Sequence, residues 1–317
     1  MVAYYEYEDA DTMRVFIDSS AGTTGLRIRE RLKARADIEL IALPEAMRKD
    51  ANARRDALNA ADIAFLCLPD AAAIEAVQLI ENPDTAVIDT STAHRTAPGW
   101  VYGMPELYGQ RVRVAASKRV ANPGCHASGF IVLIAPLVRA GIVPKDARLG
   151  CFSLTGYSGG GKKMIAEYEA PDRSPLLDAP RQYGLTQQHK HLKEMAAVCG
   201  LDNMPGFSPI VADFYSGMEV SVQLFDADIE AVKDAYRRAY PGPVIRYVED
   251  ADEGGFLSAA AYSGRDDMEV TVTGHSERVL LTARFDNLGK GASGAAIQNM
   301  NILMGVDETM GLILGGK

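Results

Sequence analysis

Short apolar runs alternate with amphipathic stretches through the first third of the chain. The runs fall at 15–17, 38–43, 63–68, 86–89 and 112–116, and each has the length of a buried strand. A helix is predicted after the first run, to about residue 35, and another after the third run, over 71–80. Asp70 is the expected N-cap of the second of these helices, and Ile74, Val77 and Ile80 share its inward side. Strands alternating with helices predict a parallel sheet covered on both faces. Such sheets bind ligands beyond the C-terminal ends of their strands.

The pattern changes after residue 148. Clean alternation over 218–224 is typical of an antiparallel strand with one buried face, and further strands are predicted at 148–154, 244–248, 269–273 and 279–285. Helices are predicted over 186–199, 228–240 and 292–305, with a Pro-rich functional loop at 171–183. We therefore expect an α+β domain with a mainly antiparallel sheet over 125–288. Residues 1–124 and 289–317 are expected to form the other domain, onto which the last helix packs back.

Composition and charge narrow the class of protein. The 317 residues are 47% hydrophobic and 24% charged, which suits a globular protein of two domains. The net charge of −9 disfavours non-specific nucleic-acid binding, so an anionic ligand needs a local basic site. No run approaches the ~18 apolar residues of a membrane span. No basic segment followed by an apolar one opens the chain, so we expect a cytoplasmic protein. Residues 1–12 are expected to be a short extension, packed on a neighbour or frayed.

One of the four cysteines has an unusual setting. Cys67, Cys151 and Cys199 lie in apolar runs and are expected in the core, and the absence of CxxC spacing argues against a zinc site or a disulfide framework. Cys125 instead follows Asn-Pro-Gly and opens a predicted helix over 125–140. Free N–H groups and the helix dipole favour a thiolate there. The residues alone leave two possibilities, a reactive nucleophile or a small core cysteine beneath a turn.

A glycine-containing turn, Ser19-x-x-Gly22-x-x-Gly25, joins the first predicted strand to the first helix. This is the context in which helix N–H groups hold a pyrophosphate, although a simple tight βα turn has the same appearance. Basic residues after the second strand either hold the 2′-phosphate of NADP or form a solvated helix face. They are Arg48, Lys49, Arg54 and Arg55.

The start of the helix predicted over 186–199 carries two histidines. His191 and Glu194 are three residues apart and can touch, which would orient the imidazole and raise its basicity. His189 and His191 would face different directions on a regular helix, which disfavours a two-histidine metal site. The same residues also suit a solvated helix start. The Gly-rich loop 156–163, which ends in Lys162 and Lys163, is similar to an anion-binding nest but lacks the Walker spacing.

Several of these stretches together resemble one family. Ala21-Gly22-Thr23-Thr24-Gly25-Leu26, Tyr102-Gly103-Met104-Pro105-Glu106-Leu107, Asn122-Pro123-Gly124-Cys125, His189-Lys190-His191-Leu192-x-Glu194 and Asp286-Asn287-Leu288-x-Lys290-Gly291-Ala292 occur in this order. From about residue 14 to the end, the chain resembles N-acetyl-gamma-glutamyl-phosphate reductase in its shorter, second-type form. Single motifs are weak, but four or more in register are specific.

The resemblance implies a Rossmann-type NADP-binding domain, an α+β catalytic and dimerisation domain, and a homo-oligomer, dimer or tetramer. It implies NADPH-dependent reduction of a small acyl-phosphate substrate, N-acetyl-L-glutamyl 5-phosphate, in arginine biosynthesis. A thiolate suits that substrate because Cys125 would expel phosphate and form a thioester. The histidine pair would move the proton. We favour His191, oriented by Glu194, with His189 binding substrate.

The remaining roles are also implied by the resemblance. Cofactor binding falls to Gly22, Thr23, Thr24, Gly25, Pro69, Ser91, Asn287 and Lys290, and substrate binding to Arg95, Asn122, Lys162 and His189, with Lys163 a further phosphate candidate. No metal is expected. The chain departs from the family at Ser19, where glycine is usual, and at Lys193, where proline is often found.

Three other functions are compatible with parts of the pattern. Aspartate-semialdehyde dehydrogenase shares the fold and the thioester chemistry and would differ in its substrate pocket. A non-catalytic NADP-binding regulator would use Cys125 as a redox sensor. A cysteine hydrolase would use Cys125 with His191, although the glycine-containing turn argues against it.

Overall fold

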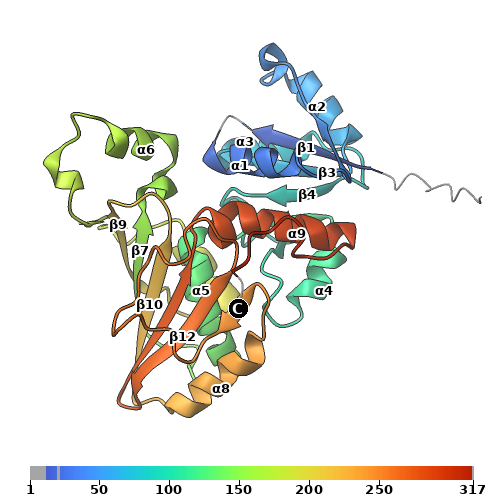
Figure 1. The fold of residues 1–317 in the computed structure, drawn as a ribbon. Coiled ribbons are helices and arrows are strands. Elements are labelled where there is room, and N and C mark those ends of the chain that lie inside the picture. The colour runs from blue at the N-terminus through green and yellow to red at the C-terminus, as the bar shows by residue number, and fades with distance from the viewer. Residues whose placement is uncertain (1–11, 20–21, 316–317) are drawn as a thin grey trace, which may run out of the picture.

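The computed structural model describes residues 12–19 and 22–315. The predicted extension at 1–12 lies outside this part of the chain except for Thr12. Two sheets organise the fold, with the parallel one uppermost in Figure 1. Among the described residues, no helix combines the length and apolar character that crossing a membrane requires.

The first sheet has six strands in the order β2-β1-β3-β4-β6-β5, and every pair is parallel. Its strands are β1 (Met13–Ser19), β2 (Ile38–Ile41), β3 (Ile63–Cys67), β4 (Ala86–Asp89), β5 (Val101–Tyr102) and β6 (Arg119–Ala121). In β3, Phe65 packs in one core cluster and Leu66 in another. Both sheet faces are therefore buried, which explains the continuous apolar run, and each such side chain contributes about 1.5–3 kcal/mol.

Helices cover both faces of this sheet, as the sequence predicts. Residues of α1 (Thr23–Leu32), α4 (Gln110–Ala115) and α9 (Gly294–Met304) share one core cluster with the strands. Residues of α2 (Ala51–Ala60) and α3 (Asp70–Gln78) share the other. The last helix, α9, runs along the junction between the two sheets (Figure 1). The chain also contains the short helix η1 (Glu45–Met47).

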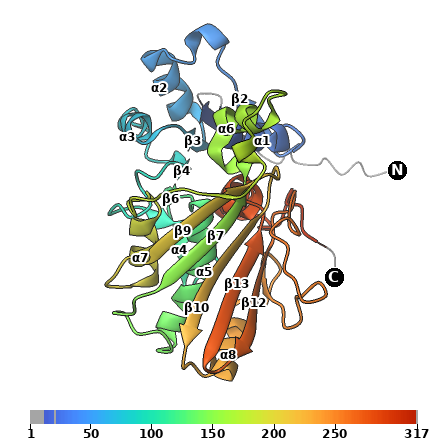
Figure 2. The same ribbon diagram turned by 90° about the vertical axis from the view of Figure 1, so that its left-hand side faces the viewer.

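The second sheet has seven strands in the order β11-β12-β13-β10-β7-β9-β8 and is mainly antiparallel, as predicted. Figure 2 shows one face of this sheet, with α5, α7 and α8 behind it. The strands are β7 (Gly150–Gly156), β8 (Arg181–Gln182), β9 (Gly206–Ala212), β10 (Met218–Phe225), β11 (Ile245–Tyr247), β12 (Met268–His275) and β13 (Arg278–Phe285). The helices are α5 (Cys125–Arg139), α6 (Gly161–Glu169), α7 (Leu192–Cys199) and α8 (Ile229–Ala239), with the short helices η2 (Tyr157–Gly160), η3 (Pro175–Leu177) and the π-helix η4 (Gly289–Ser293).

Three local predictions are wrong. Residues 112–116 belong mostly to helix α4 and not to a strand, because Val114 packs in the core while Val112 is 73% exposed. Pro69, not Asp70, is the N-cap of α3, and Asp70 instead accepts a hydrogen bond from the Thr92 N–H. The buried face of α3 is formed by its alanines at 73 and 76, so Ile74 is exposed. Strand β9 has no counterpart among the predicted elements.

Candidate active site

Cys125 is the first residue of α5, as predicted. Gly124 is the N-cap, with extended backbone and no side-chain cap, so the first N–H groups of the helix remain available to a ligand. A Cβ on Gly124 would lie 2.5 Å from His191 Nε2 and 2.6 Å from Glu194 Oε1, so only glycine fits here. Cys125 is partly exposed on the wall of a cleft of about 350 Å³ between the two sheets. The cleft wall combines α1, the loop before α5, residues 158–161 and η4.

The environment of the Cys125 thiol contains opposing effects. Burial raises its pKa, while the His126 backbone N–H and the positive charges of Arg95 and Lys190 act to lower it. Burial is the largest effect, so the pKa of the Cys125 thiol is raised overall, although the helix N–H acts in the predicted direction. Further stabilisation of the Cys125 thiolate would come from a bound ligand or from a closer approach of Arg95 and Lys190.

His189 and His191 lie before α7, which begins at Leu192 and not at 186. Gln187 has a φ of 56°, which breaks any helix through this segment. Because the segment is a turn, the two rings lie 4.7 Å apart and both line the cleft. The prediction that they face different directions is therefore wrong.

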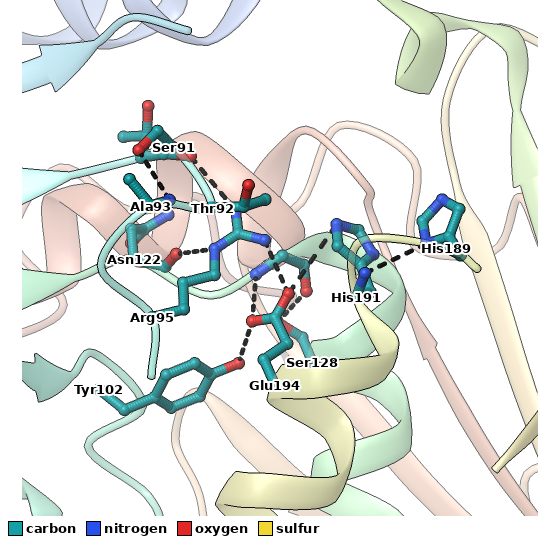
Figure 3. A network of polar contacts seen from close by, with 12 residues as sticks. Ser91, Thr92, Ala93, Arg95, Tyr102, Asn122, Ser128, His189, His191 and Glu194 are labelled. Carbon is teal, nitrogen blue, oxygen red and sulfur yellow. Dashed lines mark hydrogen bonds and ion pairs between the residues drawn. The ribbon is translucent and has the colours of Figure 1, made fainter. Parts of the chain in front are cut away.

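Glu194 has a different set of partners from the predicted one. Its Oε1 accepts a hydrogen bond from Arg95 Nη1 at 2.7 Å, and its Oε2 accepts from Tyr102 Oη at 2.9 Å and from the Gly124 N–H at 3.3 Å (Figure 3). His191 Nε2 lies 3.9 Å from Oε1, too far for a hydrogen bond. Glu194 thus joins Arg95 to the backbone just before the nucleophile.

Both histidines are held in the neutral form. Burial lowers the pKa of His191 well below its usual value, and the neighbouring His126 and Arg95 lower it further. Burial and Lys190 lower the pKa of His189. The expectation that Glu194 makes His191 more basic is therefore wrong. His191 Nδ1 is buried without a hydrogen-bond partner in the described structure, whereas His189 Nδ1 accepts from the His191 N–H at 3.3 Å (Figure 3).

Three further predicted residues line the cleft but are held by the protein. Arg95 also donates from Nε to the Asn122 carbonyl at 3.0 Å (Figure 3). The Asn122 side chain donates to the Ala292 carbonyl at 3.0 Å. Asn287 accepts from the Gly217 N–H at 2.9 Å and donates to Ser158 Oγ at 3.0 Å. These side chains shape the cleft, and only Arg95 carries a charge toward it.

The structure does not bring the predicted lysines into the cleft. Lys162 and Lys163 are exposed on α6 and do not line it. Lys290 is 2% exposed and forms an ion pair of 2.7 Å with Glu106. Its neighbour Gly291 packs against the nucleophile, since a Cβ there would lie 3.0 Å from Cys125 Cβ. Lys190 is the lysine that lines the cleft.

The predicted cofactor residues divide into two groups. Thr23 and Thr24, in the first turn of α1, line the cleft, and Thr23 Oγ1 is buried without a partner in the described structure. Gly22 is the N-cap of α1, which has no side-chain cap. This uncapped helix end fits a pyrophosphate. Pro69 and Ser91 follow β3 and β4 without lining the cleft, and Ser91 Oγ donates to Asp89 at 2.7 Å.

A second cavity of about 80 Å³ lies beside α1 and β2. Gly25, Arg29 and Arg48 are among the residues that line it. Arg54, from the predicted basic cluster, instead forms a partly buried ion pair of 2.7 Å with Asp18. Arg48 of the basic cluster therefore faces a cavity that could receive a phosphate, whereas Arg54 forms an ion pair within the protein.

Sequence reasoning missed several residues at the site. His126, Tyr183 and Lys190 line the cleft, and Tyr102 binds Glu194. His126 follows the predicted Cys125 in sequence and Lys190 precedes the predicted His191, so these positions could have been predicted as site residues from their neighbours. Within residues 12–19 and 22–315, no group of three or more His, Cys, Asp or Glu is arranged to hold a metal ion.

Comparisons with known proteins agree with this geometry. Residues 9–115 match the NAD-binding domain family of semialdehyde dehydrogenases, and residues 125–287 match the corresponding dimerisation domain family. Solved aspartate semialdehyde dehydrogenases share the fold. One from Vibrio cholerae has a TM-score of 0.70 at 17% identity, covering 92% of this chain and 98% of its own. One from Candida albicans, solved with NADP, has a TM-score of 0.66 at 15% identity and the same coverage.

Curated relatives are much more similar in sequence. N-acetyl-gamma-glutamyl-phosphate reductase 2 from Nostoc sp. is 43% identical over 94% of this chain and 99% of its own length. The enzyme of that name from Pseudomonas putida is 44% identical over 94% and 98%. N-acetyl-gamma-glutamyl-phosphate reductase from Rhizobium leguminosarum is 46% identical over 92% and 98%. At this identity and coverage, and with the nucleophile motif and the histidine pair meeting in one cleft, the chain belongs to the N-acetyl-gamma-glutamyl-phosphate reductase family.

Proposed function

We propose that this protein reduces N-acetyl-L-glutamyl 5-phosphate to N-acetyl-L-glutamate 5-semialdehyde with NADPH, in arginine biosynthesis. One observation carries the proposal. Cys125, the histidine pair and the uncapped start of α1 line the same cleft, so a nucleophile, proton carriers and a cofactor-binding turn meet there. The curated relatives bear the name of this reaction.

Cys125 attacks the acyl carbon, and its new C–S bond replaces the C–O bond to phosphate, which leaves. Arg95 and Lys190, whose positive charges act to lower the pKa of the thiol, favour the thiolate and attract the phosphate. NADPH, when bound, supplies the hydride that reduces the thioester carbonyl. Free N–H groups at the start of α5 face the oxygen on which negative charge develops. Collapse of the thiohemiacetal then breaks the C–S bond and releases the aldehyde.

The two histidines divide the proton chemistry. His189 accepts a backbone N–H at Nδ1, so its own proton is on Nε2 and can be donated to the reduced oxygen. His191 lines the same cleft and is held neutral, so it can take up the proton when the thiohemiacetal collapses. Arg95 and Asn122 hold the cleft wall against which the substrate lies. Glu194 acts by fixing Arg95 and Gly124 and does not itself exchange protons.

We assign cofactor binding to residues 1–124 with 289–317, and substrate binding to 125–288. The orphaned hydroxyl of Thr23 and the uncapped start of α1 suit the pyrophosphate. Arg29 and Arg48, beside the end of β2, suit the 2′-phosphate that distinguishes NADP from NAD. The dimerisation domain supports a homo-oligomer, which we take to be a dimer or tetramer. Four free cysteines suit a reducing compartment such as the cytoplasm.

The reverse reaction tests this function. Purified protein receives NADP⁺ and phosphate with either N-acetylglutamate semialdehyde or aspartate semialdehyde, and NADPH formation is followed by absorbance. The proposal predicts phosphate-dependent turnover with the acetylated aldehyde and at least a hundredfold lower kcat/KM, about 3 kcal/mol, with the other. Preference for aspartate semialdehyde would favour the related dehydrogenase. NADPH binding without turnover of either would favour a redox regulator.

A further inference from the structure

His126, the residue after the nucleophile, stands in the middle of a hydrogen-bonded chain that the thioester chemistry does not use. Its Nδ1 lies 2.6 Å from Ser153 Oγ on β7, and its Nε2 lies 2.6 Å from Tyr183 Oη. Ser153 is 0% exposed and His126 is 4% exposed. Tyr183 is only partly buried and lines the cleft together with His126. The chain therefore leads from the interior of the second domain to the cleft wall.

Counting donors and acceptors fixes the direction of the protons in this chain. The Ser153 hydroxyl has His126 Nδ1 as its one side-chain partner in the described structure, so a buried hydroxyl proton would be orphaned unless it is donated there. His126 Nδ1 is then the acceptor, and the imidazole proton is on Nε2. That N–H donates to the Tyr183 oxygen. The Tyr183 hydroxyl proton has no acceptor among the described residues and is free to point into the cleft.

Two properties hold this arrangement in place. Burial lowers the pKa of His126 to about 3, so the ring stays neutral and has one donor and one acceptor. The ring also packs against Phe207, at 5.4 Å between centroids, and against His191 at 5.5 Å, which restrains it from turning over. Burial and the nearby Cys125 raise the pKa of Tyr183, so its hydroxyl remains a donor close to the nucleophile.

We propose that Ser153 and His126 are positioning residues that direct the Tyr183 hydroxyl into the cleft, where it donates a hydrogen bond to a carbonyl oxygen of the acyl substrate. The inference rests on the proposed function for the identity of that substrate. The direction of the protons rests on the protein alone. Tyr183 is thus a further substrate-contacting residue. His126 then has two contacts near the site: its backbone N–H donates to the Cys125 sulfur, and its ring N–H donates to the Tyr183 oxygen.

Nitrogen-15 NMR of the imidazoles tests the proton direction without any substrate. The chain has only five histidines, and the spectrum of a His126→Asn variant identifies the His126 signals. The wild type is expected to show a protonated Nε2 and an unprotonated Nδ1 at His126. In Ser153→Ala, where the fixed donor is lost, both nitrogens should move toward averaged shifts. A protonated Nδ1 in the wild type, or an unchanged spectrum in Ser153→Ala, would overturn the inference.

Kinetics with the acyl phosphate and NADPH test the contact itself. Tyr183→Phe keeps the ring and removes the donor, so kcat/KM should fall about 10- to 100-fold. NADPH binding and alkylation of Cys125 by iodoacetamide should stay within twofold of the wild type. Tyr157→Phe is the matched control, because Tyr157 lies outside the cleft wall and bonds to Glu169. An unchanged kcat/KM in Tyr183→Phe would refute the contact between Tyr183 and the substrate. If the wild type is itself inactive on this substrate, the proposed function is refuted, while the NMR test of the proton direction stays valid.

Discussion

Arg95 and Glu194, 99 residues apart in sequence, form an ion pair of 2.7 Å at the cleft. Their side chains are 8% and 2% exposed, so neither charge can be solvated if the other is removed. The pair joins the loop after β4, at the end of the parallel sheet, to the first turn of α7 in the second half of the chain. It also sets the backbone before Cys125, because Glu194 accepts the Gly124 N–H.

Glu194→Ala should lower the free energy of unfolding by about 3–5 kcal/mol, since it leaves the Arg95 charge buried and unpaired. Urea denaturation followed by circular dichroism measures this. Asp234→Ala is the matched control, because its ion pair with Arg237 is exposed and should cost less than about 1 kcal/mol. Equal losses in the two variants would show that the buried pair has no special structural role.

Stability should fall in mild acid because His126 and His191 are buried in the neutral form. Burial lowers the pKa of His126 to about 3 and that of His191 well below its usual value. The unfolded chain takes up protons on these residues below about pH 6.5, whereas the folded chain does not. The stabilisation is therefore complete above that pH and lost progressively below it, by up to about 1.4 kcal/mol per pH unit for each histidine.

Urea unfolding between about pH 7 and pH 5 tests this dependence. The free energy of unfolding should depend less steeply on pH in His126→Asn than in the wild type, by the equivalent of about one proton. A wild-type free energy of unfolding that stays constant over this range would contradict the prediction.

The parallel sheet was predictable because its strands are buried on both faces and separated by amphipathic helices. Residues 63–68 show this clearly, since every residue of β3 is buried. The helix after Cys125 was predictable from the helical spacing of its apolar residues. Residues 112–116 were not, because the two valines alternate with arginine as in a strand, while the helix that forms buries only one of them against the last helix of the chain.

The partners of polar side chains were the least predictable part of the site. Sequence spacing places Glu194 within reach of His191, but it carries no information about Arg95 or Tyr102, which come from distant segments and take both carboxylate oxygens. Lys290 likewise belongs to a motif with a resemblance-based role at the cofactor, yet its ammonium group lies against Glu106 and Gln298 inside the protein. The sequence motifs were enough to predict which segments form the cleft, whereas the contacts of Glu194 and Lys290 depend on tertiary packing with distant segments.

Lys290→Met should therefore affect stability and not cofactor affinity. Glu106 would be left buried without its ion-pair partner, with an expected loss of about 3–5 kcal/mol. The double variant Lys290→Met with Glu106→Gln should recover part of this loss. Fluorescence titration with NADPH, under conditions where both variants are folded, should give Kd values close to the wild type. A stable variant that loses NADPH affinity would instead place Lys290 at the cofactor.

Arg48→Ala should weaken the preference for NADPH over NADH. Arg48 lines the cavity beside β2, where it can meet a 2′-phosphate, so KM for NADPH should rise about tenfold or more, equivalent to about 1.4 kcal/mol, while KM for NADH stays the same. Arg55→Ala is the control, because Arg55 lies outside the lining of this cavity and its side chain pairs with Asp56 at 3.5 Å. The same change in both KM values would remove the role in cofactor selection.

Transfer of the acyl group from the acyl phosphate to Cys125 is tested most directly by mass spectrometry of the intact protein. Wild-type protein and Cys125→Ser are mixed with N-acetyl-L-glutamyl 5-phosphate without NADPH, and phosphate release is measured in parallel. The wild type should gain one N-acetylglutamyl group per subunit, mapped to Cys125, with one equivalent of phosphate released, and NADPH should then discharge it as aldehyde. The Cys125→Ser variant should bind NADPH normally but show no adduct and no turnover. An adduct on another residue, or turnover retained in Cys125→Ser, would contradict the thioester mechanism.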